Sequence, residues 1–153
     1  MTNMIHEFDV VAFSALDLAV TEAFAKQAAI PALFPGMLDT VDKWLRDSGV
    51  AATGDNYALY DRFSPDGMRV RIGFPVAARF NDTEAVKCAA LAPGRAAHVR
   101  HTGPYSGLPA AHSALNAWCT QQAHQLAGVS WEVYGDWCDD QSKLVTDLYF
   151  RLS

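Results

Sequence analysis

The sequence predicts an α+β fold made of two copies of a strand–helix–strand–strand module, with an antiparallel sheet and the helices on one face of it. Three observations support this fold class. The chain repeats itself at a constant offset, each half contains apolar residues at helical spacing, and the flanking segments alternate apolar and polar residues with the period of a strand. The 153 residues suffice for one domain with two such modules, expected at about 5–80 and 86–153.

The repeat relates positions that are 74 residues apart (109 − 35 = 74) and contains four identical pairs. These pairs are Pro35 and Pro109, Trp44 and Trp118, Gly54 and Gly128, and Tyr60 and Tyr134. At one position the copies differ in chemistry, because Glu132 of the second copy corresponds to Ala58 of the first. A carboxylate within the apolar run of one copy only is a candidate functional group.

In the first half, turn and capping signals separate the elements. The predicted elements are a strand at 8–15, a helix from Asp17 to Ile30, a second helix from Pro35 to Gly49, and strands at 57–63 and 69–74. Pro31 is expected to stop the first helix, whereas Pro35 suits the first turn of the second and Gly49 its C-terminal cap. Val70, Ile72 and Phe74 alternate with polar or small residues, which predicts a strand with one buried face.

The second half repeats this order after a polar linker at 76–84. The predicted elements are a short apolar piece at 88–91, a strand at 95–101, a helix from Leu108 to about His124, and strands at 130–137 and 144–152. The helix places Leu108, Ala111, Leu115 and Trp118 along one stripe, and this stripe is expected to face the sheet.

The face on which each strand residue lies follows from the period of two. In the last strand, Leu148, Phe150 and Leu152 are predicted to face the helices. In the preceding strand we expect the apolar Trp131 to pack beneath the helices, so Glu132 would lie on the helix-free face. Three aromatic side chains are expected around it there, namely Tyr60, Tyr134 and Tyr149.

Composition limits the function classes. The formal net charge of −5 and the lack of a Lys/Arg cluster argue against nucleic-acid binding. Cys88, Cys119 and Cys138 form no C-x-x-C pair, as expected in a reducing compartment. The first ten residues lack the basic and apolar regions of a signal peptide, and no long apolar run follows, so the sequence predicts a cytoplasmic protein with no membrane contact.

Two motifs carry a family resemblance. The segment 98–109 contains Gly-Pro-Tyr, and after a helix with Trp118 the segment 127–134 ends in Trp-Glu-Val-Tyr. Together with the closing strand 145–150 and its counterpart 73–76, they resemble the GyrI-like small-molecule-binding domains. This family includes the effector-binding halves of AraC-type and multidrug-responsive MerR-type regulators, and stand-alone proteins.

The resemblance implies two modules around a pseudo-two-fold axis and a ligand groove between them, on the face without helices. It also implies that Glu132 meets cationic groups in this groove, with Tyr105 and Tyr149 at aromatic pocket positions. Two departures from the family pattern stand out. Arg151 occupies a position that is usually proline, and the loop 135–140 lacks the usual proline-bearing turn, so the rim of the groove is expected to differ.

The resulting hypothesis is a stand-alone binding protein for small, apolar, often cationic aromatic molecules, which would sequester drugs or xenobiotics. Glu132 would supply the charge, and the stacking walls would come from Tyr60, Tyr105, Tyr134 and Tyr149. One alternative is a hydrolase of strained electrophilic natural products, with Glu132 and Tyr149 as catalytic residues. A second alternative is a protein-interaction role like that of the gyrase-inhibiting family members, for which the sequence offers no specific support.

Other chemistries find little support in the sequence. His98 and His101 are three apart on a strand and so face opposite ways, which argues against a metal pair. His112 and Cys119 are two helical turns apart, too far for a nucleophile–base pair. With no phosphate-binding loop or zinc signature, no metal or other cofactor is expected. The chain also contains no helix-turn-helix segment, so no DNA binding is expected of it alone.

Overall fold

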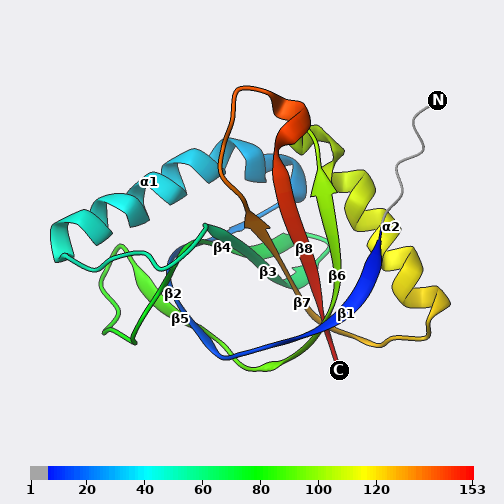
Figure 1. The fold of residues 1–153 in the computed structure, drawn as a ribbon. Coiled ribbons are helices and arrows are strands. Elements are labelled where there is room, and N and C mark those ends of the chain that lie inside the picture. Colours follow the sequence, from blue (N-terminus) through cyan, green and yellow to red (C-terminus); the bar gives the residue numbers. More distant parts are fainter. Residues whose placement is uncertain (1–6) are drawn as a thin grey trace. The chain divides into compact units, whose positions relative to one another are not determined.

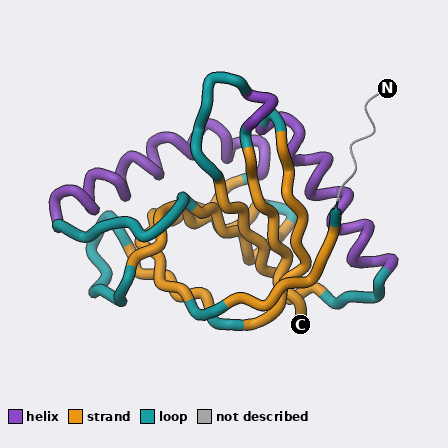
Figure 2. Tube along the Cα trace, viewed as in Figure 1, coloured by secondary structure: helices purple, strands orange, loops and turns teal. Residues whose placement is uncertain are grey.

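The structure is a computed structural model, and it describes residues 7–153 (Figure 1). The chain divides into two compact units. Unit 2 comprises residues 14–93, and unit 1 comprises residues 94–153 together with the N-terminal segment up to residue 13. Strands make up much of each unit, and each contains one long helix (Figure 2). The α+β class with antiparallel strands is therefore confirmed.

Unit 2 is a four-stranded antiparallel sheet with one helix. Its strands lie in the order β5-β2-β4-β3, and its elements are β2 (Leu16–Ala25), α1 (Ile30–Ser48), β3 (Tyr57–Ser64), β4 (Gly67–Val76) and β5 (Lys87–Leu91). The helix packs on β2 and β4, where Val41 and Leu45 are buried against Ala19 and Val76. As predicted, α1 ends at Gly49, which adopts a left-handed conformation with φ of 73°.

Unit 1 has the same plan. Its strands lie in the order β1-β6-β8-β7, and its elements are β1 (Phe8–Phe13), β6 (Gly94–Thr102), α2 (Leu108–Gln121), β7 (Leu126–Tyr134) and β8 (Val145–Leu152). The predicted stripe of α2 forms the core with the sheet, because Leu108, Ala111 and Leu115 are buried against Val99 and Leu148.

The strand registers show that the two copies correspond. Tyr57 pairs with Gly73 in unit 2, and Trp131 pairs with Tyr149 in unit 1, so the offset is 74 on one strand (131 − 57) and 76 on the next (149 − 73). The two residues that replace one another are Gly73 and Tyr149. A Cβ atom at Gly73 would overlap the carbonyl oxygen of Ala19, so unit 2 admits only glycine there. The pseudo-two-fold axis stays a prediction.

Two predictions about the N-terminal part are wrong or need revision. The helix expected from Asp17 to Ile30 is the strand β2, followed by a single 3-10 turn at Gln27–Ala29. Leu18, Ala19 and Val20 are almost fully buried in this strand, which pairs with β4 on one edge and β5 on the other. Strand pairing on both edges thus outweighs the local helix signal.

The first strand also has an unexpected partner. Residues 8–15 were expected to begin the first module, but β1 pairs with β6 of unit 1. The contacts between β1 and the rest of unit 1 include Phe8 stacked on Trp118, with ring centroids 5.5 Å apart, and Phe13 edge-on to Trp131 at 5.0 Å. Unit 1 therefore combines two segments of the chain, whereas unit 2 is contiguous.

Candidate functional site

Glu132 lies near the C-terminal end of β7, directly opposite Leu148 of β8. The residue is only 3% exposed, and both oxygens of its carboxylate are hydrogen-bonded. Tyr134 donates its hydroxyl to Oε1 at 2.9 Å, and Nε2 of His112, on α2, lies 3.1 Å from Oε2. The site is thus a buried carboxylate between a strand and a helix.

The prediction that Glu132 lies on the helix-free face is wrong, because its carboxylate meets His112 of α2. The neighbouring Trp131 occupies the opposite face, where it stacks on Tyr149 with ring centroids 5.4 Å apart. Trp131 is buried as predicted, at 2% exposure, but not under the helix. Both faces of β7 are covered here, so an apolar residue does not mark the helix side.

The predicted tyrosines fall into different places. Tyr134 shares the face of Glu132, and Tyr105 meets it edge-on with ring centroids 5.6 Å apart. Tyr149 lies on the other face of unit 1, between Trp131 and His98, so the pair expected for catalysis, Glu132 and Tyr149, is separated by the sheet. Tyr60 belongs to unit 2, where it pairs with Val70 and is partly buried.

His112 belongs to the site, although it was not predicted from the sequence as a site residue. Its ring stacks on Phe150 of β8, with centroids 5.7 Å apart, while its Nε2 reaches Glu132. The available signal was its place on α2 beside Ala111, at the edge of the stripe that faces the sheet. A histidine on the inward side of a helix needs a polar partner, and Glu132 is that partner.

A row of polar residues crosses three strands beside the site. His101, Thr146 and Tyr134 are consecutive cross-strand neighbours on β6, β8 and β7. His101 and Thr146 are 2% and 0% exposed. Nε2 of His101 lies 2.9 Å from the carbonyl oxygen of Pro104, but among the described residues neither its Nδ1 nor the Thr146 hydroxyl has a hydrogen-bond partner. The neighbourhood of Glu132 is therefore polar as well as aromatic.

A separate charged cluster lies on the opposite face of unit 1. The His98 imidazole sits between two carboxylates, with Nδ1 and Nε2 each 2.8 Å from an oxygen of Asp9 and Asp147. Arg100 also donates to Asp147, from Nε at 3.0 Å and Nη2 at 3.2 Å. The hydrogen bond to Asp147 raises the pKa of His98; burial opposes this, and Asp9 adds to it. Burial by itself would raise the pKa of Asp147, but the bonds from His98 and Arg100 outweigh it and lower that pKa.

We also searched the described residues for a metal-binding group and for pockets away from Glu132. Within residues 7–153, no three His, Cys, Asp or Glu side chains are grouped so that they could hold a metal ion. An open pocket of about 450 Å³ in unit 2 is lined by Arg79, Phe80, Asn81, Asp82 and Cys88, none of them a predicted site residue. Within residues 7–153, neither α1 nor α2 has the length and apolarity needed to cross a bilayer.

Two similarly built units, one of them with a buried carboxylate among aromatic rings, define the class as an α+β domain suited to holding a small organic molecule. The sequence comparison with protein families agrees and is more specific. Residues 25–153 match the GyrI-like small molecule binding domain, and the chain belongs to this family. A comparison with curated protein sequences gave no match.

Solved structures share the fold. The C-terminal domain of EcmrR aligns over 98% of this chain and 99% of its own, with a TM-score of 0.84 and 17% identity. SAV2435 bound to tetraphenylphosphonium aligns over 96% and 94%, with a TM-score of 0.72 and 12% identity. A hydrolase encoded by lin2189 from Listeria innocua aligns over 96% and 92%, with a TM-score of 0.63 and 11% identity. When this chain is aligned with the EcmrR chain of the EcmrR–DNA complex, it covers 59% of that chain.

Proposed function

We propose that this protein binds and sequesters small, apolar, often cationic aromatic molecules at Glu132 of unit 1. The observation that carries the proposal is the buried carboxylate in an aromatic setting. Tyr134 and His112 are hydrogen-bonded to it, and Tyr105 lies edge-on to the Tyr134 ring. A carboxylate that has lost most of its water is stabilised when a cation approaches it. The surrounding rings add cation–π attraction of about 0.5–2 kcal/mol per contact.

The arrangement of the site suggests a route for the ligand. Tyr105 is 39% exposed, whereas Tyr134 is partly buried and Glu132 is almost fully buried. A cationic aromatic molecule would first contact the Tyr105 ring and then reach the carboxylate past Tyr134. The tetraphenylphosphonium bound to SAV2435 is a cation of this kind, and it supports the choice of ligand class.

A titration with tetraphenylphosphonium and the neutral triphenylphosphine oxide tests the proposal. We expect Glu132→Gln to weaken binding of the cation by about 1–3 kcal/mol and to leave binding of the neutral compound nearly unchanged. The reason is that only the cation is attracted by the carboxylate charge. Glu84→Gln, in an exposed loop of unit 2, is the control for the change in net charge. Equal losses for the two compounds would show that the carboxylate does not recognise charge.

Hydrolysis is a second candidate, and one observation favours it. The His112–Glu132–Tyr134 chain of hydrogen bonds can move protons, because Glu132 can accept a proton from water while Tyr134 or His112 supplies one to a departing atom. In this version Tyr134 replaces Tyr149, which lies on the opposite face.

The test is incubation with a panel of strained electrophiles, followed by mass spectrometry. A water adduct that forms faster than the uncatalysed background, and disappears in both Glu132→Gln and Tyr134→Phe, would support hydrolysis. Turnover that survives in Glu132→Gln would remove Glu132 from the chemistry, and no adduct across the panel would leave binding alone.

A further inference from the structure

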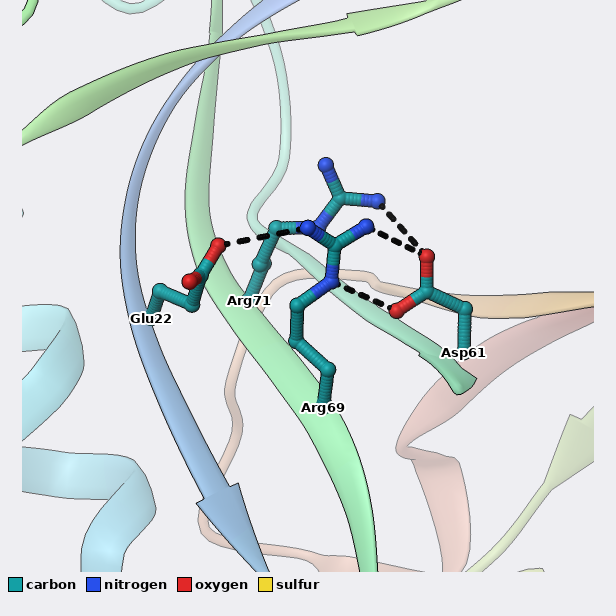
Figure 3. Close-up of polar contacts among 4 residues, drawn as sticks. All are labelled: Glu22, Asp61, Arg69 and Arg71. Atoms are coloured by element: carbon teal, nitrogen blue, oxygen red, sulfur yellow. Dashed lines mark hydrogen bonds and ion pairs between the residues drawn. The ribbon is translucent and has the colours of Figure 1, made fainter. Parts of the chain in front are cut away.

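A second charged cluster lies in unit 2, on the face of the sheet opposite α1. Arg69 and Arg71 alternate along β4 with Val70, Ile72 and Phe74, and Phe74 packs with the core under α1, so the two arginines point the other way. Figure 3 shows their guanidinium groups side by side, between Asp61 of β3 and Glu22 of β2.

The carboxylates in this cluster form more and shorter hydrogen bonds with Arg69 than with Arg71. Arg69 donates to Asp61 through two short bonds, from Nε at 2.7 Å and from Nη2 at 2.5 Å, and its Nη1 lies 3.5 Å from Glu22. Among the described residues, Arg71 reaches only the Asp61 oxygen already shared with Arg69, at 3.5 Å from its Nη2. Its other Nη atom points away from both carboxylates in Figure 3.

Arg71 is nevertheless well buried. Its side chain is 16% exposed, and among the described residues its buried Nε has no hydrogen-bond partner. Burial, and then the neighbouring Arg69, lower the pKa of Arg71. A guanidinium that is removed from water without full pairing carries a free-energy cost, which an anion at its Nη atoms would relieve.

The other copy of the repeat shows what a fully paired version looks like. Glu22 pairs with Arg71 in the register of unit 2, and Arg100 pairs with Asp147 at the corresponding place in unit 1 (100 − 22 = 78 and 147 − 71 = 76). The charges are reversed between the copies. In unit 1 the central Asp147 receives hydrogen bonds from both His98 and Arg100, whereas in unit 2 the central Arg71 has one long contact.

From this contrast we propose that Arg71 is a binding site for the carboxylate of a small aromatic ligand. The planar fork of a guanidinium matches the two oxygens of a carboxylate, and the outward Nη atom is the group that remains to be paired. Tyr57 lies on the same face as a diagonal neighbour of Arg71 and offers a ring for the aromatic part. The site involves other residues than Glu132 and has the opposite charge preference.

The test is calorimetric titration of the whole chain with 1-naphthoate and with the neutral 1-naphthamide. We expect 1-naphthoate to bind to the unmodified chain. Arg71→Met should lower the affinity at least about ten-fold. Arg71→Lys should lower it less, because lysine keeps the charge but loses the planar pair of N–H donors. Glu22→Gln should tighten binding, because it removes a neighbouring negative charge that repels the carboxylate of the ligand. Shifts of the Arg71 Nε–H signal in NMR spectra would place the ligand at this residue.

Two control variants distinguish binding at Arg71 from a general effect of net charge and from binding at Glu132. Arg46→Met removes an exposed cation from α1 and should leave 1-naphthoate binding unchanged, as should Glu132→Gln. Arg71→Met should fold, because it removes a poorly paired buried charge, and its thermal melt checks this. Equal binding of 1-naphthamide, equal binding by Arg71→Met, displacement by sulfate as readily as by benzoate, or no binding of 1-naphthoate would each overturn the proposal.

Discussion

The His101 imidazole limits how closely the turn before α2 approaches the sheet of unit 1. It is 2% exposed and is held by the carbonyl oxygen of Pro104. A Cβ atom placed on Gly107 would lie 2.7 Å from Cε1 of His101, closer than non-bonded carbon atoms approach one another. Because the ring is buried and hydrogen-bonded, it has little freedom to move aside.

Gly107→Ala is therefore expected to destabilise the protein by about 1–3 kcal/mol, the usual cost of overpacking a core. Urea denaturation monitored by circular dichroism measures this loss. The matched control is Gly36→Ala in α1, where an added Cβ would meet nothing within 4 Å. That change should stabilise the protein by about 0.4–1 kcal/mol, because alanine loses less backbone entropy in a helix. Similar effects of the two variants would contradict the steric argument.

At the scale of single elements, His98 joins three strands of unit 1. Its ring lies on β6, and its two nitrogens reach Asp9 on β1 and Asp147 on β8. The ring also stacks on Tyr149, with centroids 4.8 Å apart, and Arg100 shares Asp147. Since both nitrogens face carboxylate oxygens, the cluster favours the protonated imidazole, in agreement with its raised pKa.

The pH dependence follows from the direction of this shift. The pKa of His98 is higher in the folded protein than the ordinary value of 6.5, so its contribution to stability is complete below pH 6.5 and is lost as the pH rises through the folded-state value. His98→Gln should therefore reduce the fall in unfolding free energy between mildly acidic and alkaline pH. Urea titrations at pH 6 and pH 9 measure the difference, with His124→Gln as the control for losing an imidazole elsewhere in unit 1. An unchanged pH slope in His98→Gln would show that the cluster does not bind the proton more tightly when folded.

At the scale of the whole molecule, the N-terminal strand stabilises the C-terminal unit. Phe8 and Phe13 pack on Trp118 and Trp131, and the Arg151 guanidinium lies 5.1 Å from the centre of the Phe13 ring. Unit 2, by contrast, begins after residue 13. Loss of β1 should therefore perturb a part of the chain that is distant in sequence more than the part that follows it.

Deletion of residues 1–13 tests this arrangement. In a chain labelled with 5-fluorotryptophan, we expect the fluorine NMR signals of Trp118 and Trp131 to shift or broaden. The signal of Trp44 should change little, because Trp44 packs on Phe80 and the core of unit 2. A larger change at Trp44 than at Trp118 and Trp131 would contradict the assignment of β1 to unit 1.

The sequence by itself determined the features that depend on neighbouring residues. The repeat located both helices that carry Trp44 and Trp118, although α1 begins at Ile30 and not at Pro35. The correspondence of Tyr57 and Trp131 in the hairpin registers agrees with its offset of 74. The α1 cap at Gly49 and the inward side of β8 were also predicted correctly. Glycine caps and periodic apolar patterns act within a few residues, so they can be read locally.

Only the tertiary structure decided the features that depend on distant partners. β2 is a strand because β4 and β5 pair with its two edges, and β1 belongs to unit 1 because β6 pairs with it. The face of Glu132 was misassigned for a related reason. Trp131 is buried by Tyr149 and Phe13 on the side away from α2, so burial and helix contact are different properties in β7. An alternating pattern tells which residues share a face, but the identity of that face depends on what the rest of the chain places against it.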